Sequence, residues 1–561
     1  MASEKEKDRL RERIGARLAV RDFDGALDAV RELAKDEATQ AEALGAAASI
    51  HIEAGDAEGA APLVEALLQK EPQSVYGAFL RARILFAEGK FLSAREALTA
   101  LLAREKTLAP VYAEKVCNLL GQTARTLGLA KEAADAYEKA AAAASPALLP
   151  AAWSNVLFAL HFLRVPQQEV YRAHCAYGEL FRAVTPFLHR LRQKRRKIRI
   201  GYISGDFRQH VMQYFIWPFL AGYDADSFEV YVYSLGKSDQ YTDFFRTLVT
   251  KWRDLSAHAR DMERIAREIH ADKVDILFDL AGHTAGTGLA ALAWKPAPLQ
   301  LSGLGYMATT GLPAVDYFVT DHYCDPAGSG SEAFYVEKLL RLTSQFCYNG
   351  YTHLPTSIGT PARERGYIQF ATFNQYGKLQ DDILKAWQEI MERVPRARLL
   401  LKNSAYGKKH VVQSAYERFR RLGFDMSRVQ FECATKDYMW RYLDVDIALD
   451  TFPWPGGGTT CDALYMGVPV VSYYTERHST RFTYSILANI GLSDLASTRL
   501  SDYIETAVAL AGNLDLLDAL HRELRDRVKA SPVMDQERYI REMEECYRAV
   551  WNAWESENTS L

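Results

Sequence analysis

The pattern of hydrophobic and polar positions divides the chain into two regions. Up to about residue 188, apolar residues recur with the spacing of amphipathic helices. From residue 198 onward, short runs of β-branched and aromatic residues alternate with further helical stretches. The first region therefore predicts an all-α fold, and the second predicts βαβ units in parallel sheets.

The helices of the first region repeat with a regular period. Ala26, Ala60 and Ala94 are 34 residues apart, and Ala133 follows after 39 more. The residue five positions before each of these alanines is, in order, Arg21, Gly55, Gly89 and Gly128. Pro72 stands where the helix that contains Ala60 should stop. This pattern resembles tetratricopeptide (TPR) repeats, which stack into a concave surface that usually binds polypeptide. An unrelated alanine-rich helical bundle is the alternative.

We expect four segments along the chain. They are TPR-like helical repeats over residues 1–165, connecting helices and a basic linker over 166–196, a first α/β domain over 197–360, and a second over 361–561 that includes the C-terminal helices. The basic run His189–Lys197 is short and single, so we interpret it as a solvated linker and not as a nucleic-acid site. The second boundary falls in Tyr351–Gly366, which is rich in Pro, Gly and Thr.

The expected strands form two sets of similar size. The first set is Ile198–Ile203, Phe228–Ser234, Val274–Asp279 and Val315–Thr320. The second set is Ile368–Phe373, Arg398–Lys402, Val429–Cys433, Asp446–Asp450 and Val468–Tyr474. Two Rossmann-like halves of this kind imply a cleft, with the second half binding a nucleotide.

Composition narrows the classes of function. Of the 561 residues, 48% are hydrophobic and 25% are charged, as in ordinary soluble proteins. A net charge of −3 gives no case for nucleic acid or an acidic membrane surface as a partner. Seven scattered cysteines without a CxxC pair argue for reduced thiols and against a disulfide framework or zinc site. The chain starts without an apolar leader and contains no run of about 18 apolar residues, so we predict a cytoplasmic protein without membrane insertion.

The stretch Thr451–Tyr474 reads as a Gly-rich turn, a short helix and a strand. A turn of this type exposes backbone N–H groups at a helix N-terminus, where the helix dipole favours an anion. The residues that could meet a phosphate there are Gly456, Gly457, Gly458, Thr459 and Thr460. Asp462, one turn into the helix, could accept hydrogen bonds from a ribose. The pattern is neither a P-loop nor GxGxxG, and an ordinary βα loop is the alternative.

Lys378 is the candidate charge for a diphosphate. It follows the first strand of the second half and precedes a helix, so it lies in the crevice where ligands of open α/β sheets bind. A surface lysine is the alternative interpretation. Cys433–Lys436 lies at the tip of the third strand on the same edge, where a nucleobase could meet backbone groups.

Several ordered motifs follow the repeats. They are IRIGYISGDFRQH, DLAGHTAG, PAPLQLSGLGYMATTG, VDYFVTD, FNQYGK and GGGTTCDALYMGVPVV. Together they resemble glycosyltransferase family 41, the family of the O-linked N-acetylglucosamine transferases and their bacterial relatives, over about Lys197 to the C-terminus. The resemblance implies a GT-B fold, a UDP-sugar donor, inversion at the anomeric carbon, and no metal or other cofactor. It also implies a protein side chain as acceptor, Ser or Thr in most members and Asn in a bacterial branch.

The resemblance also implies roles on the nucleotide side. Lys378 would contact the UDP diphosphate, and Gln375 would help to hold the nucleotide. Ala434 and Lys436 would flank the uracil. Met439 stands about where a histidine would lie beside the uracil.

The Gly-Thr loop and the helix after it have implied roles of the same kind. Thr459 and Thr460 would bind the phosphates, and Asp462 would bind the ribose. The animal enzymes carry a histidine where this chain has Gly457 or Gly458. This departure leaves the identity of the sugar open.

On the acceptor side, the resemblance implies roles for three further residues. His210 matches a histidine once proposed as the general base, and in any case near the acceptor. His283 and Tyr306 match motifs that face the sugar.

A DxD pattern at Asp444–Asp446 marks a metal site in a different glycosyltransferase fold. Here Asp446 begins an apolar strand, so we expect a structural role and no metal ligation. Two other functions compete with a protein glycosyltransferase: a TPR scaffold with a vestigial transferase region, and a GT-B enzyme acting on free nucleotide sugar. The sequence leaves open the sugar, the acceptor and the oligomeric state.

Overall fold

The computed structural model describes residues 3–19, 21–103, 109–189, 196–351 and 353–559. It divides into two compact units, Met1–Val156 with Ala405–Glu417, and Leu157–Ser404 with Arg418–Leu561. Most of the predicted basic linker, residues 190–195, lies outside the described residues. None of the helices in the described ranges has the length and apolar character that crossing a membrane requires.

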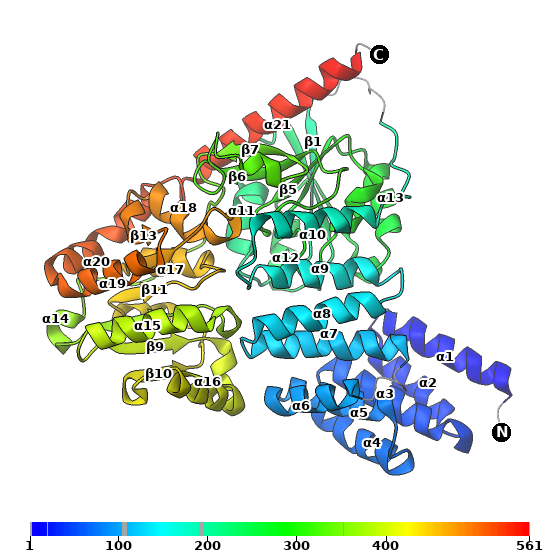
Figure 1. Ribbon diagram of the computed structural model, residues 1–561. Coiled ribbons are helices and arrows are strands. Elements are labelled where there is room, and N and C mark those ends of the chain that lie inside the picture. Colours follow the sequence, from blue (N-terminus) through cyan, green and yellow to red (C-terminus); the bar gives the residue numbers. More distant parts are fainter. Residues whose placement is uncertain (1–2, 20, 104–108, 190–195, 352, 560–561) are drawn as a thin grey trace. The chain divides into compact units, whose positions relative to one another are not determined.

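The first unit is built mainly from a series of antiparallel helices (Figure 1). These are α1 (Glu4–Ala19), α2 (Phe23–Leu33), α3 (Gln40–Ala54), α4 (Ala57–Lys70), α5 (Val75–Ala87), α6 (Phe91–Leu102), α7 (Pro110–Thr126) and α8 (Ala130–Ala143). Each helix packs against its successor, and α3, α5 and α7 also pack in a row. The arrangement confirms the expected solenoid of helical repeats.

The structure explains both kinds of position that recur in the repeats, the turn residues and the alanines. The turn positions Arg21, Gly55, Gly89 and Gly128 have φ angles of 57°, 88°, 79° and 72°. This left-handed conformation is the one that glycine adopts most easily. The alanines Ala26, Ala60, Ala94 and Ala133 are at most 1% exposed. Their small side chains allow paired helices to approach closely.

The first α/β sheet has seven parallel strands in the order β3-β2-β1-β4-β5-β6-β7. The strands are β1 (Ile198–Ser204), β2 (Phe228–Ser234), β3 (Lys251–Asp254), β4 (Ile276–Asp279), β5 (Leu299–Gly303), β6 (Tyr317–Asp321) and β7 (Lys338–Leu342). Ile200 of β1 pairs with Val230 of β2 on one side and with Ile276 of β4 on the other. These central residues are buried, because helices cover both faces of such a sheet.

The second sheet repeats this plan with six parallel strands in the order β10-β9-β8-β11-β12-β13. The strands are β8 (Gln369–Thr372), β9 (Arg398–Lys402), β10 (Val429–Glu432), β11 (Ile447–Leu449), β12 (Val470–Tyr473) and β13 (Ala496–Ser497). The strand order changes direction between β8 and β11. In sheets of this type, ligands bind beyond the carboxyl ends of the strands at that point.

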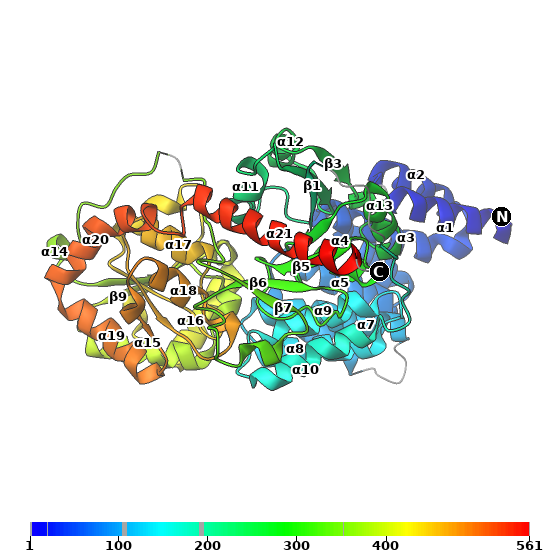
Figure 2. The same cartoon turned by 90° about the horizontal axis from the view of Figure 1, so that it is seen from above.

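Helices connect the strands and lead from the repeats to the first sheet. They are α9 (Leu149–Leu160), α10 (Gln167–Glu179), α11 (Gln213–Ala221), α12 (Gln240–Arg246), α13 (Met262–Asp272), α14 (Ala362–Arg365), α15 (Asp381–Arg393), α16 (Lys409–Arg421), α17 (Gly458–Tyr465), α18 (Phe482–Asn489), α19 (Leu500–Gly512), α20 (Leu514–Lys529) and α21 (Gln536–Thr559). The last helix returns to the first sheet, although its sequence position groups it with the second. It packs on α11, β5 and β7 (Figure 2), and the hydroxyls of Tyr547 and Tyr202 are 3.2 Å apart.

Four strands are absent from the sequence prediction. Three of them, β3, β7 and β13, lie at or near sheet edges and are short or rich in charged residues. An edge strand pairs with only one neighbouring strand, and such strands are often short or charged. Their sequences therefore carry a weak hydrophobic pattern. The fourth, β5, is central but follows the loop that contains Pro296 and Pro298, and its run of apolar residues is interrupted by Gln300 and Ser302.

Candidate active site

A cavity of about 310 Å³ lies beyond the carboxyl ends of β8, β9 and β10, and we call it the edge pocket. Its wall includes Val211 from the first half of the second unit. The structure gathers seven of the predicted nucleotide-side residues around it: Gln375, Lys378, Ala434, Gly457, Gly458, Thr459 and Asp462. Three other residues expected on the nucleotide side do not line the pocket: Lys436, Gly456 and Thr460. The three residues expected on the acceptor side, His210, His283 and Tyr306, do not line it either.

Asp450, which follows β11, holds the start of the Gly-rich loop. Its carboxylate accepts hydrogen bonds from the backbone N–H groups of Thr451 at 2.9 Å and Gly456 at 2.7 Å. The Ser472 hydroxyl of β12 donates to the other carboxylate oxygen at 2.7 Å. The loop is therefore fixed before any ligand binds.

The three glycines of the loop differ in what they allow. A Cβ atom on Gly456 would lie 2.4 Å from Thr460 Oγ1, and one on Gly458 would lie 2.8 Å from a methyl group of Val211. A Cβ atom on Gly457 would meet nothing within 4 Å. Close packing thus requires two of the glycines, while Gly457 leaves open space.

The two threonines at the N-terminus of α17 point in different directions. Thr459 lines the edge pocket, and its hydroxyl donates to Asn374 Oδ1 at 3.1 Å. Thr460 is 2% exposed, and its hydroxyl lies 2.9 Å from that of Thr483. The predicted phosphate contact of Thr460 through its hydroxyl therefore has no support in this arrangement.

Lys378 lies in a 3₁₀ turn between β8 and α15. Its ammonium donates to Asn374 Oδ1 at 3.1 Å and to the Pro455 carbonyl at 2.8 Å. Its Nζ atom also lies 5.4 Å from the centre of the Trp454 ring. Burial lowers the pKa of Lys378 to about 8, and the Asp450 carboxylate partly opposes this shift. The wall of the pocket therefore carries a positive charge at neutral pH.

Asp462 lines the pocket beside three tyrosines that the sequence did not point to. Tyr348 and Tyr351 donate to its Oδ1 at 3.1 and 2.9 Å, and Tyr438 donates to its Oδ2 at 2.8 Å. Burial raises the pKa of Asp462 to about 6, while these hydrogen bonds work in the opposite direction. A ribose hydroxyl would have to share the carboxylate with the tyrosines.

The remaining nucleotide-side residues follow the strand ends. Gln375 is exposed and lines the pocket directly after Asn374. Ala434, beyond β10, lines the pocket next to Ser404, which follows β9. Lys436 is exposed and lies outside the pocket wall. Its predicted contact with uracil stays a prediction.

His210 lies in the loop after β1, next to Val211 of the pocket wall. Its side chain is 39% exposed, and its Nδ1 atom is 3.5 Å from Asp206 Oδ1. The backbone N–H of Met212 also points to Nδ1, at 3.3 Å. The ring tautomer decides which nitrogen can accept a proton, because only one of the two carries a hydrogen in neutral histidine.

His283 and Tyr306 belong to a buried cluster, and neither lines the edge pocket. The Tyr306 hydroxyl lies 3.0 Å from His161 Nε2 and 2.8 Å from His174 Nε2. The Nε2 atom of His283 donates to the Thr310 carbonyl at 2.9 Å. Burial lowers the pKa of all three histidines, so they are neutral at pH 7. The predicted role of His283 and Tyr306 at the sugar stays a prediction.

The DxD pattern has a structural role, as expected. The Asp446 carboxylate is fully buried and accepts hydrogen bonds from the Thr360 hydroxyl and the Ala362 backbone at 2.6 and 2.8 Å. Its other oxygen accepts from the Gln369 backbone at 2.8 Å. Asp444 instead pairs with Arg441 at 2.6 Å on the surface. The two carboxylates are therefore committed to different partners.

The comparison with known protein families decides the family. The family model for glycosyl transferase family 41 matches residues 179–358 and 359–543. This chain belongs to glycosyl transferase family 41. The match spans both halves of the α/β region, including every pocket residue described above.

Curated relatives of this family 41 chain include two plant SPINDLY proteins named as probable UDP-N-acetylglucosamine–peptide N-acetylglucosaminyltransferases. The Solanum lycopersicum protein is 34% identical and the Oryza sativa subsp. japonica protein 35% identical over 416 residues, which are 72% of this chain and 44% of each relative. The chain thus spans less than half the length of these relatives.

Among solved structures, a mutant of the O-GlcNAc transferase of Thermobaculum terrenum is similar over almost the whole chain. The identity is 26%, the TM-score is 0.74, and 99% of each chain is covered. This confirms the predicted fold class of a family 41 protein: a TPR solenoid followed by two Rossmann-like domains in a GT-B arrangement.

Proposed function

We propose that this family 41 chain transfers a sugar from a UDP-sugar to a protein side chain, with inversion at the anomeric carbon and without a metal ion. The sugar is GlcNAc, or else glucose or another hexose, and Ser or Thr is preferred over Asn as the acceptor. The relatives' names, which specify UDP-N-acetylglucosamine and a peptide, support these classes. The observation that carries the proposal is the edge pocket, where the Lys378 ammonium and the N-terminus of α17 meet.

The pocket supplies what such a reaction needs. The acceptor oxygen attacks the anomeric carbon while the bond to UDP breaks, so negative charge develops on the leaving phosphate. Lys378 and the backbone N–H groups at the N-terminus of α17 stabilise that charge. The acceptor proton passes to His210, or through water to the phosphate.

The test is to incubate the purified protein with UDP-GlcNAc, with and without a mixture of polypeptides, and to measure UDP release and the intact mass of the polypeptides. We expect UDP release that depends on the acceptor and a mass gain of one sugar. Release without any acceptor dependence would favour an enzyme of free nucleotide sugars. Failure to bind UDP would favour a scaffold, and preference for a purine diphosphate sugar would contradict the UDP assignment.

Activity is expected to persist in excess EDTA. The reason is that the Asp446 carboxylate accepts hydrogen bonds from backbone and side-chain partners and has no position left for a metal ion. Asp446→Asn should then leave turnover nearly unchanged but destabilise the fold by about 1–3 kcal/mol, because it disturbs a buried hydrogen-bonded carboxylate. Activity that is lost in EDTA and regained with Mg²⁺ or Mn²⁺ would contradict the prediction.

The helical repeats are expected to select the polypeptide and to take no part in binding the donor. Deletion of residues 1–143, which ends after α8, should impair glycosylation of protein far more than UDP affinity measured by calorimetry. Circular dichroism and the melting temperature would establish that the remaining part is folded. Equal losses of both properties in a folded protein would place the repeats in the nucleotide site.

A further inference from the structure

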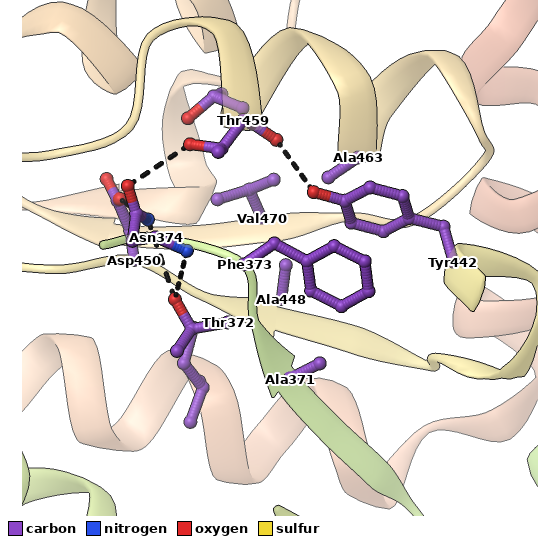
Figure 3. Close-up of a pocket in the computed structure, with 12 residues that line it drawn as sticks. Ala371, Thr372, Phe373, Asn374, Tyr442, Ala448, Asp450, Thr459, Ala463 and Val470 are labelled. Carbon is purple, nitrogen blue, oxygen red and sulfur yellow. Dashed lines mark hydrogen bonds between the residues drawn. The ribbon is translucent and has the colours of Figure 1, made fainter. Parts of the chain in front are cut away.

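Asn374 has no role in the sequence prediction, yet its side chain lies between the main groups of the site. Asn374 follows β8 and Asp450 follows β11, the neighbouring strands at which the order of the second sheet changes direction. Asn374 is 7% exposed and lines both the edge pocket and a smaller cavity that Thr372 and Asp450 also line (Figure 3).

Charged neighbours fix the orientation of the Asn374 amide. Its Oδ1 atom accepts hydrogen bonds from the Lys378 ammonium and the Thr459 hydroxyl, both at 3.1 Å. An ammonium group only donates, so the atom that faces it must be the oxygen. The Nδ2 atom then faces the Asp450 carboxylate and the Thr372 hydroxyl, each at 3.5 Å. Figure 3 shows Asn374 between Thr459 on one side and Thr372 on the other.

We propose that Asn374 is a positioning residue for the transfer reaction, whose amide oxygen holds the Lys378 ammonium and the first turn of α17 in one fixed geometry around the leaving diphosphate. This inference rests on the proposed function. The lysine side chain is a long flexible stem, and an ammonium that is already placed needs no reorganisation when charge develops on the phosphate. The other groups around Nζ are the Pro455 carbonyl, the Trp454 ring and, at longer range, the Asp450 carboxylate.

The Asn374 amide is suited to this role because its oxygen binds both Lys378 and Thr459. Both of these groups lie where they can stabilise the charge on the diphosphate. Thr459 lies in the first turn of α17, whose N-terminus favours an anion. Loss of the oxygen would release Lys378 and Thr459 together. The Asp450 carboxylate, which fixes the Gly-rich loop through Gly456, also faces the Asn374 amide nitrogen. One set of contacts thus orients the loop, the helix and the lysine.

The first test is UDP binding by calorimetry in the full chain. Asn374→Leu removes the acceptor while keeping the number and branching of the side-chain heavy atoms, and it should weaken UDP affinity about tenfold. In a Lys378→Met background the same change should cost less than about threefold, because the two residues act as a unit. Gln369→Leu is the matched control, since it removes another buried amide, at the start of β8, that donates to the Phe370 carbonyl and not to any group around Lys378. An equal loss in both backgrounds would overturn the inference.

The second test is the pH dependence of UDP affinity, which a purely structural role would not change. Burial lowers the pKa of Lys378 to about 8, so the affinity should fall as the pH rises through that value and the ammonium loses its charge. Asn374→Leu removes an acceptor that stabilises the charged form, so the fall should begin about one pH unit lower. Asn374→Asp retains an oxygen, and its fall should begin no lower than in the wild type. Identical profiles for the wild type and Asn374→Leu would overturn the inference.

The outcomes separate the inference from the function on which it rests. If the wild-type chain binds no UDP, the proposed function fails. If the wild type binds UDP and the Asn374 variants do so equally well, only the positioning role fails. Should Asn374→Leu lose its cooperative thermal unfolding, Asn374→Ala removes the same acceptor without adding an apolar group to the pocket wall.

Discussion

Replacement of Lys378 by Met is expected to lower kcat by about 10²–10³-fold, the usual cost of removing one group that stabilises transition-state charge. Lys378 is a cation of the pocket wall, and its ammonium donates hydrogen bonds to Asn374 and to the Pro455 carbonyl. A Met side chain keeps the length and the apolar stem, so the fold should remain intact. The measurements are steady-state turnover with UDP-GlcNAc and a polypeptide acceptor, and the melting temperature.

The control for Lys378→Met is Lys385→Met, because Lys385 is exposed on α15 in the same half. That variant should retain normal turnover. A Lys378→Met protein that turns over at a rate close to the wild type would exclude the lysine from the diphosphate site. Lost turnover together with a lower melting temperature would show a structural contribution in addition.

Replacement of His210 by Ala is expected to lower kcat by about 10²-fold or more if the ring accepts the acceptor proton, the usual scale for a general base. UDP affinity should change little, because the residues that line the edge pocket, the proposed nucleotide site, come mostly from the second half. His210 lies at the carboxyl edge of the first sheet, in the loop after β1. The Nδ1 atom of His210 lies 3.5 Å from the Asp206 carboxylate, and the backbone N–H of Met212 points to the same nitrogen at 3.3 Å.

Two further variants sharpen the His210 prediction. Asp206→Asn should lower kcat less than His210→Ala does, since it removes only the group that orients the ring. His258→Ala alters a histidine of the first half that lies in a separate turn after β3, and turnover should stay normal. Normal kcat with weakened UDP binding in His210→Ala would assign the residue to the donor instead.

The sequence was sufficient where the relevant residues are close together in the chain. The strand Phe228–Ser234 and the strand Arg398–Lys402 were predicted at their observed bounds, because a short apolar run between polar segments specifies a buried strand locally. The Gly-rich turn and a short helix after it were also predicted, with the helix over Cys461–Met466, whereas α17 begins three residues earlier at Gly458. The sequence also predicted a structural role for Asp446, whose carboxylate accepts hydrogen bonds from Thr360, Ala362 and Gln369 directly before β11.

The sequence did not predict contacts between segments that lie far apart along the chain. Tyr348 and Tyr351 meet Asp462 across more than 100 residues of chain. The hydroxyl of Thr460 turns to Thr483 and not to the edge pocket, although Thr459 beside it lines that pocket. A one-residue step on a helix changes direction by about 100°, so the side chains of the two adjacent threonines point to different surroundings.

The sequence by itself determined the helical repeats, the two α/β sets and the family, because periodicity, turn glycines and ordered motifs are properties of neighbouring residues. Only the tertiary structure decided how the site is assembled. The order of parallel strands sets Asn374 beside Asp450, although 76 residues separate them. It also returns α21 to the first sheet. Both outcomes depend on which strands become neighbours, and that choice is made by the packing of the whole sheet and not by any local pattern.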